Sequence, residues 1–293
     1  VVVLFAGIFP ALYVANFDIL KVLKGNFFWS KSGIWLRNGM IIVQFCIATF
    51  FIISGIIITK QVNYASSKDL GFQADQIISI GWDKQLGNRK FQEYQRIKQD
   101  LSKIPGVTDV NTSVFTIGLG ASSSSSYKLK DKNIQAQNMG TDFGYLKLFG
   151  IKMLAGRDLD ERLASDSTSV VLINKTAADA FGEDQIIGQE IDVFGKKKKI
   201  IGIVDDFHLL GLQNKIPPMI FSHIKLIEWA QSNISSITVK VQADKMEEAM
   251  AQIETYWRKD VDNTRPFNYE FIDKLFARTF KDYVNQRNLF AIL

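Results

Sequence analysis

An uncharged run over residues 38–59 constrains this chain more than any other feature. The run reads NGMIIVQFCIATFFIISGIIIT and holds no charged side chain in 22 residues. As an α-helix it would be about 33 Å long, enough to cross the hydrocarbon core of a bilayer. A buried helix of a water-soluble protein is the alternative, but such helices are usually shorter and carry a polar stripe. The sequence therefore predicts a membrane-spanning helix.

The charges on either side of this run predict its orientation. Residues 18–37 carry four basic side chains against the single acid Asp18, whereas only Lys60 follows the run closely. Basic residues accumulate on the cytoplasmic side of membrane helices. We therefore expect residues 18–37 in the cytoplasm and everything after Thr59 outside it, in a periplasm.

Residues 1–17 form a second uncharged stretch, interrupted by Pro10. It is too short for a complete span, so we interpret it as the end of another transmembrane helix. A signal peptide is the rival interpretation, but the stretch has neither a basic beginning nor a small-residue cleavage site. Because the chain starts at Val1 and stops in an apolar run at Leu293, we expect it to be a piece of a longer protein.

Charge and cysteine content exclude some classes of protein. The net charge of +5 comes from 35 basic and 30 acidic residues, a balance that does not indicate nucleic-acid binding. The single cysteine, Cys46, lies inside the predicted span. The exported part is therefore expected to be stabilised by its core and not by disulfides.

Two strand–helix–strand patterns stand far apart in the exported part. Asn88 is predicted to cap the helix of the first unit and Asp244 the helix of the second. Both helices place apolar residues three and four positions apart, which is typical of one buried face. Together the units predict a ferredoxin-like layer of helices on a sheet. The four flanking strands are expected at residues 77–82, 107–115, 237–241 and 269–272.

The fold class predicted for the chain is α+β, with a transmembrane helix and a periplasmic porter-like domain of ferredoxin-like βαβ units. A mixed α/β subdomain is predicted as an insertion within that domain. The predicted segments are the end of a transmembrane helix (1–17), a cytoplasmic loop (18–37), the transmembrane helix (38–59), a stalk (60–76), the porter-like subdomain (77–155 and 233–272), the inserted subdomain (156–232) and a stalk entering the next transmembrane helix (273–293).

Two stretches resemble nucleotide-binding motifs, but each lacks one required glycine. A phosphate-binding loop requires a second glycine before its lysine, but Ser30 takes that position in the stretch 25–32. Gly118 and Gly120 begin a dinucleotide fingerprint whose third glycine is replaced by Ser123. We therefore expect no nucleotide or other cofactor site.

Ser125 and Lys128 have the spacing at which a lysine can activate a serine nucleophile, but no companion motif follows them. Because five serines stand in a row, this spacing easily arises by chance. Residues 122–126 are better interpreted as a mobile surface loop. Lys196–Lys199 could form a docking patch for an acidic surface. A solvated turn is the favoured interpretation of such a charge run.

His208 and His223 are the only histidines, and Asp205 and Asp206 precede the first. Two histidines and a carboxylate could hold a metal ion. A structural turn is favoured for residues 205–208, because the turn ends an apolar strand and no further ligand cluster appears. The sequence predicts no catalytic, cofactor-binding or metal-binding residue.

The order of several short motifs resembles the FtsX-like ABC transporter permeases. The set is similar in particular to the MacB-type permeases, in the long, twofold-repeated versions of Bacteroidetes-like bacteria. The order of the motifs, more than any single one, carries the resemblance. They are Ala6-Gly7, Pro10-Ala11, Leu23-Lys24-Gly25, Arg37-Asn38, Val43-Gln44-Phe45, Leu70-Gly71-Phe72, Ile104-Pro105-Gly106-Val107, Phe149-Gly150-Ile151, Leu154-Ala155-Gly156-Arg157, Ile173-Asn174, Phe181-Gly182, Ile187-Gly188, Ile201-Gly202-Ile203-Val204 and Asp206-Phe207-His208.

The resemblance implies a non-catalytic permease subunit in a bacterial inner membrane, with an ABC ATPase on a separate cytoplasmic chain. It implies mechanotransmission, in which ATP-driven motion of membrane helices moves the periplasmic domain to export or extract a substrate. Expected partners are a second permease copy, membrane lipids, and a periplasmic adaptor, a lipoprotein or a small-molecule substrate; no nucleic acid is expected. We expect the helices that would contact the ATPase to lie outside this sequence.

Two other functions remain as alternatives. A periplasmic sensor or receptor domain between two spans would relay a signal inward and would be followed by a cytoplasmic signalling domain. A membrane-tethered enzyme would need a catalytic constellation, which the motifs do not supply. A permease would instead be followed by further spans.

Overall fold

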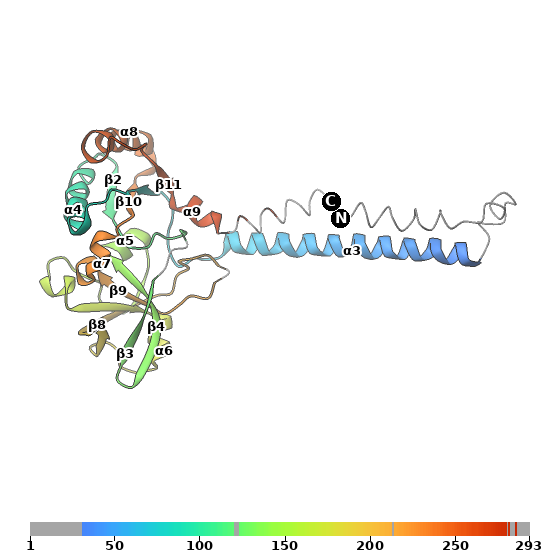
Figure 1. The fold of residues 1–293 in the computed structure, drawn as a ribbon, viewed down its shortest axis with the longest axis horizontal. Helices are drawn as coiled ribbons and strands as arrows, with labels where there is room; N and C mark the ends of the chain where they lie inside the picture. The colour runs from blue at the N-terminus through green and yellow to red at the C-terminus, as the bar shows by residue number, and fades with distance from the viewer. Residues whose placement is uncertain (1–30, 120–122, 213, 280, 282–284, 286–293) are drawn as a thin grey trace. The chain divides into compact units, whose positions relative to one another are not determined.

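The computed structural model describes residues 31–119, 123–212, 214–279, 281 and 285. The chain divides into two compact units. One unit comprises Val1–Val62 and Asn285–Leu293, and the other comprises Asn63–Val284. Both units are drawn in Figure 1.

The long helix α3 (Lys31–Ser67) forms the described part of the first unit and continues to the start of the second. Its segment Asn38–Gln61 is long and apolar enough to cross a membrane, and none of that window is buried in the protein. The predicted membrane-spanning helix is confirmed as an exposed apolar helix. The helix ends inside the predicted stalk 60–76. The predictions for residues 1–17 and for most of 18–37 lie outside the described residues.

A four-stranded antiparallel sheet forms one layer of the second unit (Figure 1). Its strand order is β11-β1-β10-β2. The two strands of each strand–helix–strand unit are therefore not adjacent, and one strand of the other unit lies between them. This arrangement is the split βαβ pattern of ferredoxin-like folds, as predicted. The elements are β1 (Ile77–Gly81), α4 (Lys90–Leu101), β2 (Val107–Asn111), β10 (Ser236–Val241), α8 (Met246–Tyr256) and β11 (Tyr269–Phe271).

The predicted helix caps are wrong. A 3₁₀ turn, η1 (Gly87–Arg89), precedes α4 and places Arg89 at its N-cap, while η4 (Ala243–Lys245) precedes α8 and places Lys245 there. Neither helix receives a side-chain capping hydrogen bond. The extra turn places each N-cap one residue beyond the predicted one. The apolar periodicity of the helix does not specify this local detail.

Seven strands form the second sheet, in the order β5-β8-β6-β9-β4-β3-β7. An additional β7–β8 pairing joins six of them into a closed ring, termed the barrel here, with β5 beside it. The pairs β4–β9 and β6–β8 are parallel. The strands are β3 (Ser124–Leu129), β4 (Lys132–Thr141), β5 (Met153–Gly156), β6 (Val170–Asn174), β7 (Glu190–Val193), β8 (Lys196–Val204) and β9 (Met219–His223).

The barrel draws on more of the chain than the predicted insertion 156–232. It begins at β3, so residues predicted for the porter-like subdomain belong to the second sheet. Ser124–Ser126, predicted as part of a mobile loop, pair with β4 instead, because β4 offers a matching row of backbone groups. Residues 63–284 form one compact unit, so the boundaries between subdomains stay an interpretation.

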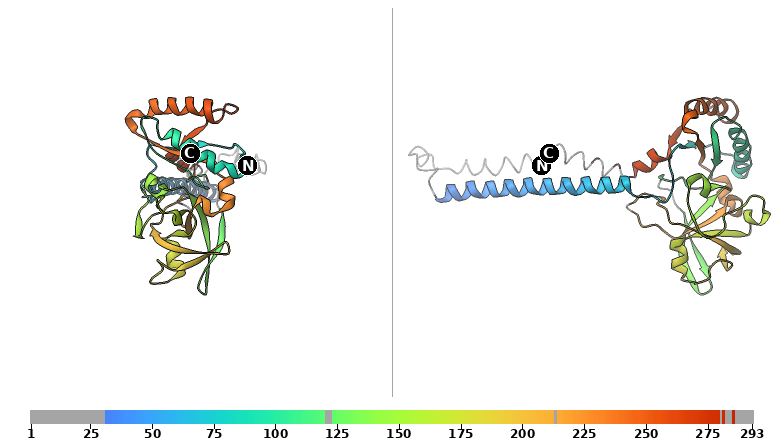
Figure 2. Two further views of the ribbon diagram at one scale, coloured as in Figure 1. Left: turned by 90° about the vertical axis from the view of Figure 1, so that its left-hand side faces the viewer. Right: turned by 180° about the vertical axis from the view of Figure 1, so that it is seen from behind.

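Short helices link these strands, and two apolar clusters hold the unit together. One cluster runs through the ferredoxin-like layer and into the second sheet, so both layers share it; the other fills the barrel around Tyr127, Phe181 and Ile191. Figure 2 shows the two layers from further sides. The remaining elements are α5 (Tyr145–Phe149), η2 (Ala164–Ser167), α6 (Lys175–Phe181), η3 (Ile224–Leu226), α7 (Glu228–Ser232), η5 (Trp257–Val261, a π-helix) and α9 (Ile272–Arg278).

Candidate functional site

The chain enters the second unit through a segment that lies directly on the turn after β8. Gly71 has a φ of +78°, and a Cβ there would lie 2.5 Å from the backbone oxygen of Asp206. Only glycine combines this conformation with so close an approach. The backbone N–H of His208 donates to the carbonyl of Leu70 at 2.9 Å. The entry segment is therefore bound to this turn by its own backbone.

Phe72 sits at the centre of an aromatic cluster. Its ring centroid lies 6.2 Å from that of Phe149, 6.4 Å from that of Phe207 and 5.3 Å from that of Phe276, each in an edge-on arrangement. All four rings are buried. Edge-on aromatic pairs add to the stabilisation that burial provides. Phe276 belongs to α9, so the segment that enters the unit touches the helix that leaves it.

A second glycine brings α9 into this cluster. Gly118 has a φ of +86°, and a Cβ there would lie 2.8 Å from the backbone nitrogen of Phe276. The N–H of Gly118 also donates to the carbonyl of Leu209, just beyond the turn after β8. We use the name junction for residues 70–72, Gly118, Phe149, residues 206–208 and Phe276.

The Asp206 carboxylate fastens the junction to the barrel. Its Oδ1 accepts hydrogen bonds from Asn174 Nδ2 at 2.7 Å and from the backbone N–H of Thr176 at 3.1 Å. Its Oδ2 accepts one from Thr176 Oγ1 at 2.7 Å. Asn174 caps α6 by accepting from the N–H of Ala177. Because both carboxylate oxygens are engaged by protein donors, the turn has the contacts of a structural element.

A buried carboxylate joins the two layers at a different place. Asp142 Oδ2 accepts from Tyr94 Oη and from Lys98 Nζ, both at 2.6 Å, and Oδ1 lies 3.3 Å from His223 Nε2. Tyr94 and Lys98 project from α4, Asp142 follows β4, and His223 ends β9. We use the name carboxylate node for these four residues.

The surroundings of Asp142 favour its charged form. Burial by itself would raise its pKa, but the hydrogen bond with His223 and the charge and hydrogen bond of Lys98 hold the pKa well below its usual range. Burial raises the pKa of the Tyr94 hydroxyl, as does the neighbouring carboxylate. The node therefore contains an ionised carboxylate that accepts a hydrogen bond from a neutral phenol and pairs with the lysine.

The structure separates the residues that the sequence analysis considered, and did not favour, as catalytic or metal-binding pairs. Ser125 and Lys128 stand three positions apart on β3, which places their side chains on opposite faces. His223 lies in the carboxylate node, and His208 lies in the junction, where burial and the charge of Lys68 lower its pKa. Within the described ranges, no three histidine, cysteine, aspartate or glutamate residues gather as metal ligands.

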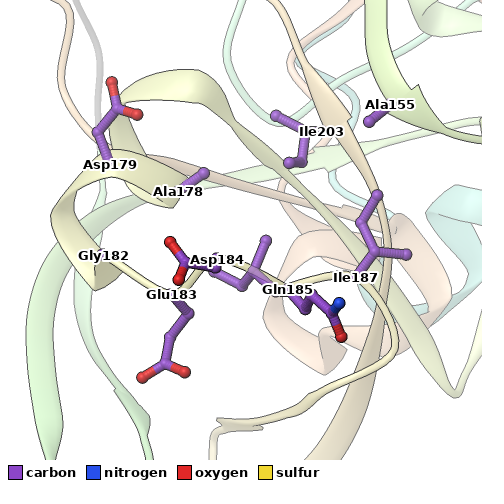
Figure 3. A pocket seen from close by; sticks show the side chains of 10 residues that line it. Ala155, Ala178, Asp179, Gly182, Glu183, Asp184, Gln185, Ile187 and Ile203 are labelled. Atoms are coloured by element: carbon purple, nitrogen blue, oxygen red, sulfur yellow. The ribbon is translucent and has the colours of Figure 1, made fainter.

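An open groove lies between α6 and strands β5 and β8 (Figure 3). Its floor is apolar, with Ala155, Ala178 and Ile203, and the carboxylates of Asp179 and Glu183 stand at its rim. Asp179 pairs with Lys175 and Glu183 pairs with Lys130. These ion pairs offset two of the acidic side chains that line the groove, which also include Asp184.

Sequence reasoning missed both the junction and the carboxylate node. One signal for the junction existed, because Leu70-Gly71-Phe72, Phe149-Gly150 and Asp206-Phe207-His208 all belong to the motifs that carry the resemblance, and the structure brings all three together. The node left no such signal. Its lysine and its histidine lie 44 and 81 residues from Asp142, and no pattern links them.

Comparisons with known proteins agree with this architecture. Residues 40–256 match the family described as the MacB-like periplasmic core domain. The fold is similar to that of the periplasmic region of MacB from Actinobacillus actinomycetemcomitans, with a TM-score of 0.53 and 20% identity over 72% of this chain and 95% of that one. The extracellular domain of the noncanonic ABC-type transporter YknZ from Gram-positive bacteria gives a TM-score of 0.49 at 13% identity, over 66% and 98% of the two chains.

A domain of a putative permease from Porphyromonas gingivalis gives a TM-score of 0.46 at 19% identity and covers 67% of this chain and 89% of that one. No curated protein matches the sequence significantly. The family match spans well over half of the chain and includes most of the apolar segment of α3. The chain therefore belongs to the family of MacB-like periplasmic core domains, and it is an inner-membrane protein whose main domain is periplasmic.

Proposed function

We propose that this chain is part of the permease subunit of a MacB/FtsX-type ABC transporter, whose periplasmic domain couples ATP hydrolysis on a separate cytoplasmic chain to substrate export or extraction. The coupling is mechanical. Movement of the membrane helices is passed to the periplasmic domain through residues 60–76 and 273–293. A second permease copy completes the transporter, and a periplasmic adaptor, lipoprotein or small molecule is the partner or substrate.

The contact between Phe72 and Phe276 is the observation that carries this proposal. One residue lies at the entry to the periplasmic unit and the other at its exit, and their ring centroids are 5.3 Å apart. A displacement of either membrane connection is therefore applied at one place. If the two connections were attached at separate surfaces, they could move independently.

The contacts of the junction favour transmission of a displacement into the domain over its absorption at the junction. Phe72, Phe149, Phe207 and Phe276 all belong to the apolar cluster that both layers share. Closely packed side chains transmit strain because little free volume remains to absorb it. The turn at Asp206 passes the same displacement to α6 and the barrel through three hydrogen bonds.

A flexible insertion tests the mechanical coupling. A run of glycines placed after Lys281 in the full-length permease should leave ATP hydrolysis by the partner largely intact and abolish the cellular transport phenotype. A glycine-rich segment behaves as a flexible coil and dissipates displacement. The same run inserted after Asp131, in the β3–β4 hairpin, is the control and should preserve both activities. If transport survives the insertion after Lys281 at normal expression, residues 273–293 act only as a tether and the mechanical coupling is wrong.

The orientation of the membrane helix is tested by chemical labelling. Cysteines introduced in place of Lys24 and Lys132 should react with an impermeant thiol reagent from opposite sides of the membrane, because the charge asymmetry places residues 18–37 in the cytoplasm. Lys132 is exposed at the start of β4, so its cysteine should be accessible. Equal labelling of both positions from outside would contradict the proposed topology.

A further inference from the structure

The turn of the β7–β8 hairpin holds an aromatic residue in an unfavourable backbone conformation. Phe194 and Gly195 form a two-residue loop with φ values of +53° and +78° between the paired residues Val193 and Lys196. Hairpin turns of this kind need positive φ at both central positions, and Asn-Gly suits them best. A bulky residue with positive φ is uncommon and strained. The geometry of the turn therefore does not explain a phenylalanine at this position.

Burial does not explain Phe194 either. Its ring meets the edge of Tyr127 with a centroid distance of 6.3 Å, yet the residue remains 51% exposed. A side chain that packs for stability would lose far more of its contact with water. An asparagine would relieve the backbone strain at little cost in buried area. The chain therefore keeps an exposed aromatic residue where its own fold would favour another.

Lysines dominate the surface beside this aromatic residue. Lys128 on β3 and Lys196–Lys199 on β8 accompany only two acids on the strand between them, Glu190 and Asp192. Asp192 stands opposite Lys128 and Lys197 on the neighbouring strands, and Glu190 stands opposite Lys199. The carboxylate of Glu190 forms an ion pair with Lys197 Nζ at 3.6 Å. The β7–β8 hairpin together with Lys128 is termed the basic hairpin. Its acids compensate only part of its positive charge.

The lysines also repel one another. Lys198 is half-buried and donates to the carbonyl of Thr168; burial, followed by the charge of Lys196, lowers the pKa of its ammonium group. An anionic group beside Lys196 would relieve this repulsion. The chemistry that complements the basic hairpin is therefore a set of carboxylates with an apolar contact for Phe194.

We propose that the basic hairpin docks an acidic surface of another periplasmic protein, with Phe194 as the apolar anchor. Aromatic residues, phenylalanine included, are enriched at protein–protein interfaces, where a polar rim surrounds an apolar core. The two acids give the hairpin a fixed order of opposite charges, which a protein surface can match. A uniformly anionic lipid surface would attract the lysines but would leave the carboxylates of Glu190 and Asp192 without a complementary charge. This docking does not depend on mechanical coupling and adds to the proposed function.

Photo-crosslinking in intact cells tests the docking on the full-length protein. With photoreactive benzoylphenylalanine in place of Lys196, we expect one discrete protein adduct whose crosslinked segment is rich in aspartate and glutamate. The double variant Lys197→Glu, Lys199→Glu should reduce the adduct at least tenfold. Lys103→Glu is the control, because the side chain of Lys103 on the other layer is 74% exposed, close to the 77% of Lys197, and it should leave the adduct unchanged.

A further variant separates the anchor from the fold. Phe194→Asn should also reduce the adduct at least tenfold while the melting temperature of the protein stays the same or rises, since asparagine tolerates positive φ. Several results would overturn the docking proposal: adducts that contain lipid only, a crosslinked segment that is not acidic, an adduct that resists charge reversal, or no adduct at normal expression. None of these results depends on whether the transport phenotype survives the insertion after Lys281.

Discussion

The junction and the carboxylate node both connect the ferredoxin-like layer with the barrel side of the periplasmic unit, but by opposite kinds of chemistry. The centre of the junction uses four buried phenylalanine rings and backbone contacts at glycines, and only its edge toward the barrel uses the Asp206 carboxylate. The node uses one ionised carboxylate with three polar partners. Apolar contacts are non-directional, whereas charge-assisted hydrogen bonds fix both distance and angle.

This difference suggests that the junction and the node have different mechanical roles. The junction receives the membrane connections, and its rings can shift by small amounts without leaving an unpaired group. The node cannot shift without exposing a buried charge to an apolar surrounding, which is costly. We therefore expect the node to fix the orientation of α4 against the second sheet while the junction transmits displacement from the membrane side into the domain.

Removing the entry and exit segments of the junction should have the largest effect on stability. A fragment of residues 63–284 should fold alone, whereas residues 77–272 lack both Phe72 and Phe276. Each buried phenylalanine lost costs about 3–5 kcal/mol, which together approaches the whole stability of a typical domain. Urea unfolding of both fragments is the measurement. Equal midpoints would show that the junction adds nothing to the fold.

Breaking the node should cost somewhat less. Asp142→Asn removes the charge that Lys98 pairs with and should lower the free energy of unfolding by about 3 kcal/mol. Asp179→Asn removes an exposed i,i+4 pair with Lys175 and should leave the free energy of unfolding nearly unchanged. If both variants unfold at the same urea concentration, the node does not hold the layers together.

Asp142→Asn should also change how the free energy of unfolding depends on pH in acid. The folded pKa of Asp142 is depressed, so its contribution is fully present above its unfolded pKa, near 3.9, and is lost as the pH falls through the folded value. The wild-type domain should therefore lose stability below about pH 4 more steeply than Asp142→Asn. Parallel curves of unfolding free energy against pH would contradict an ionised Asp142.

Gly118→Ala probes the close approach at the junction and should cost about 2 kcal/mol, because a methyl group would collide with the backbone of α9. Gly87 is the matched control. It also has positive φ, but a Cβ there would have no atom within 4 Å, so Gly87→Ala should show the conformational cost alone, about 1 kcal/mol. Equal losses in thermal unfolding would mean that contact with α9 is not tight.

The smallest expected effect belongs to Tyr94→Phe, which removes one of the hydrogen bonds to Asp142 and leaves Lys98 in place. The free energy of unfolding should fall by about 1 kcal/mol, since the carboxylate keeps its charged partner. Tyr269→Phe, at an exposed position on β11, is the control and should change nothing measurable. A loss as large as that of Asp142→Asn would show that Tyr94, not Lys98, keeps the node together.

Much of the ferredoxin-like layer could be predicted because its signals are local. The apolar positions Phe91, Tyr94, Ile97 and Leu101 recur at helical spacing, and all four are buried in α4. The start of that helix could not be predicted, since a turn of 3₁₀ helix displaced Asn88 from the cap. The barrel was only partly predicted, because the serines of β3 have no strand preference and pair only where β4 supplies a partner.

The sequence by itself determined the membrane-spanning helix, the two strand–helix–strand units and the likeness to a family. These features depend on residues that are neighbours along the chain, where charge and periodicity act directly. Only the tertiary structure decided the sites. Phe72 and Phe276 meet across 204 residues of sequence, and Asp142 finds Lys98 and His223 from two other elements. Such contacts form because the sheet order brings distant elements together, and no local pattern encodes which of them will touch.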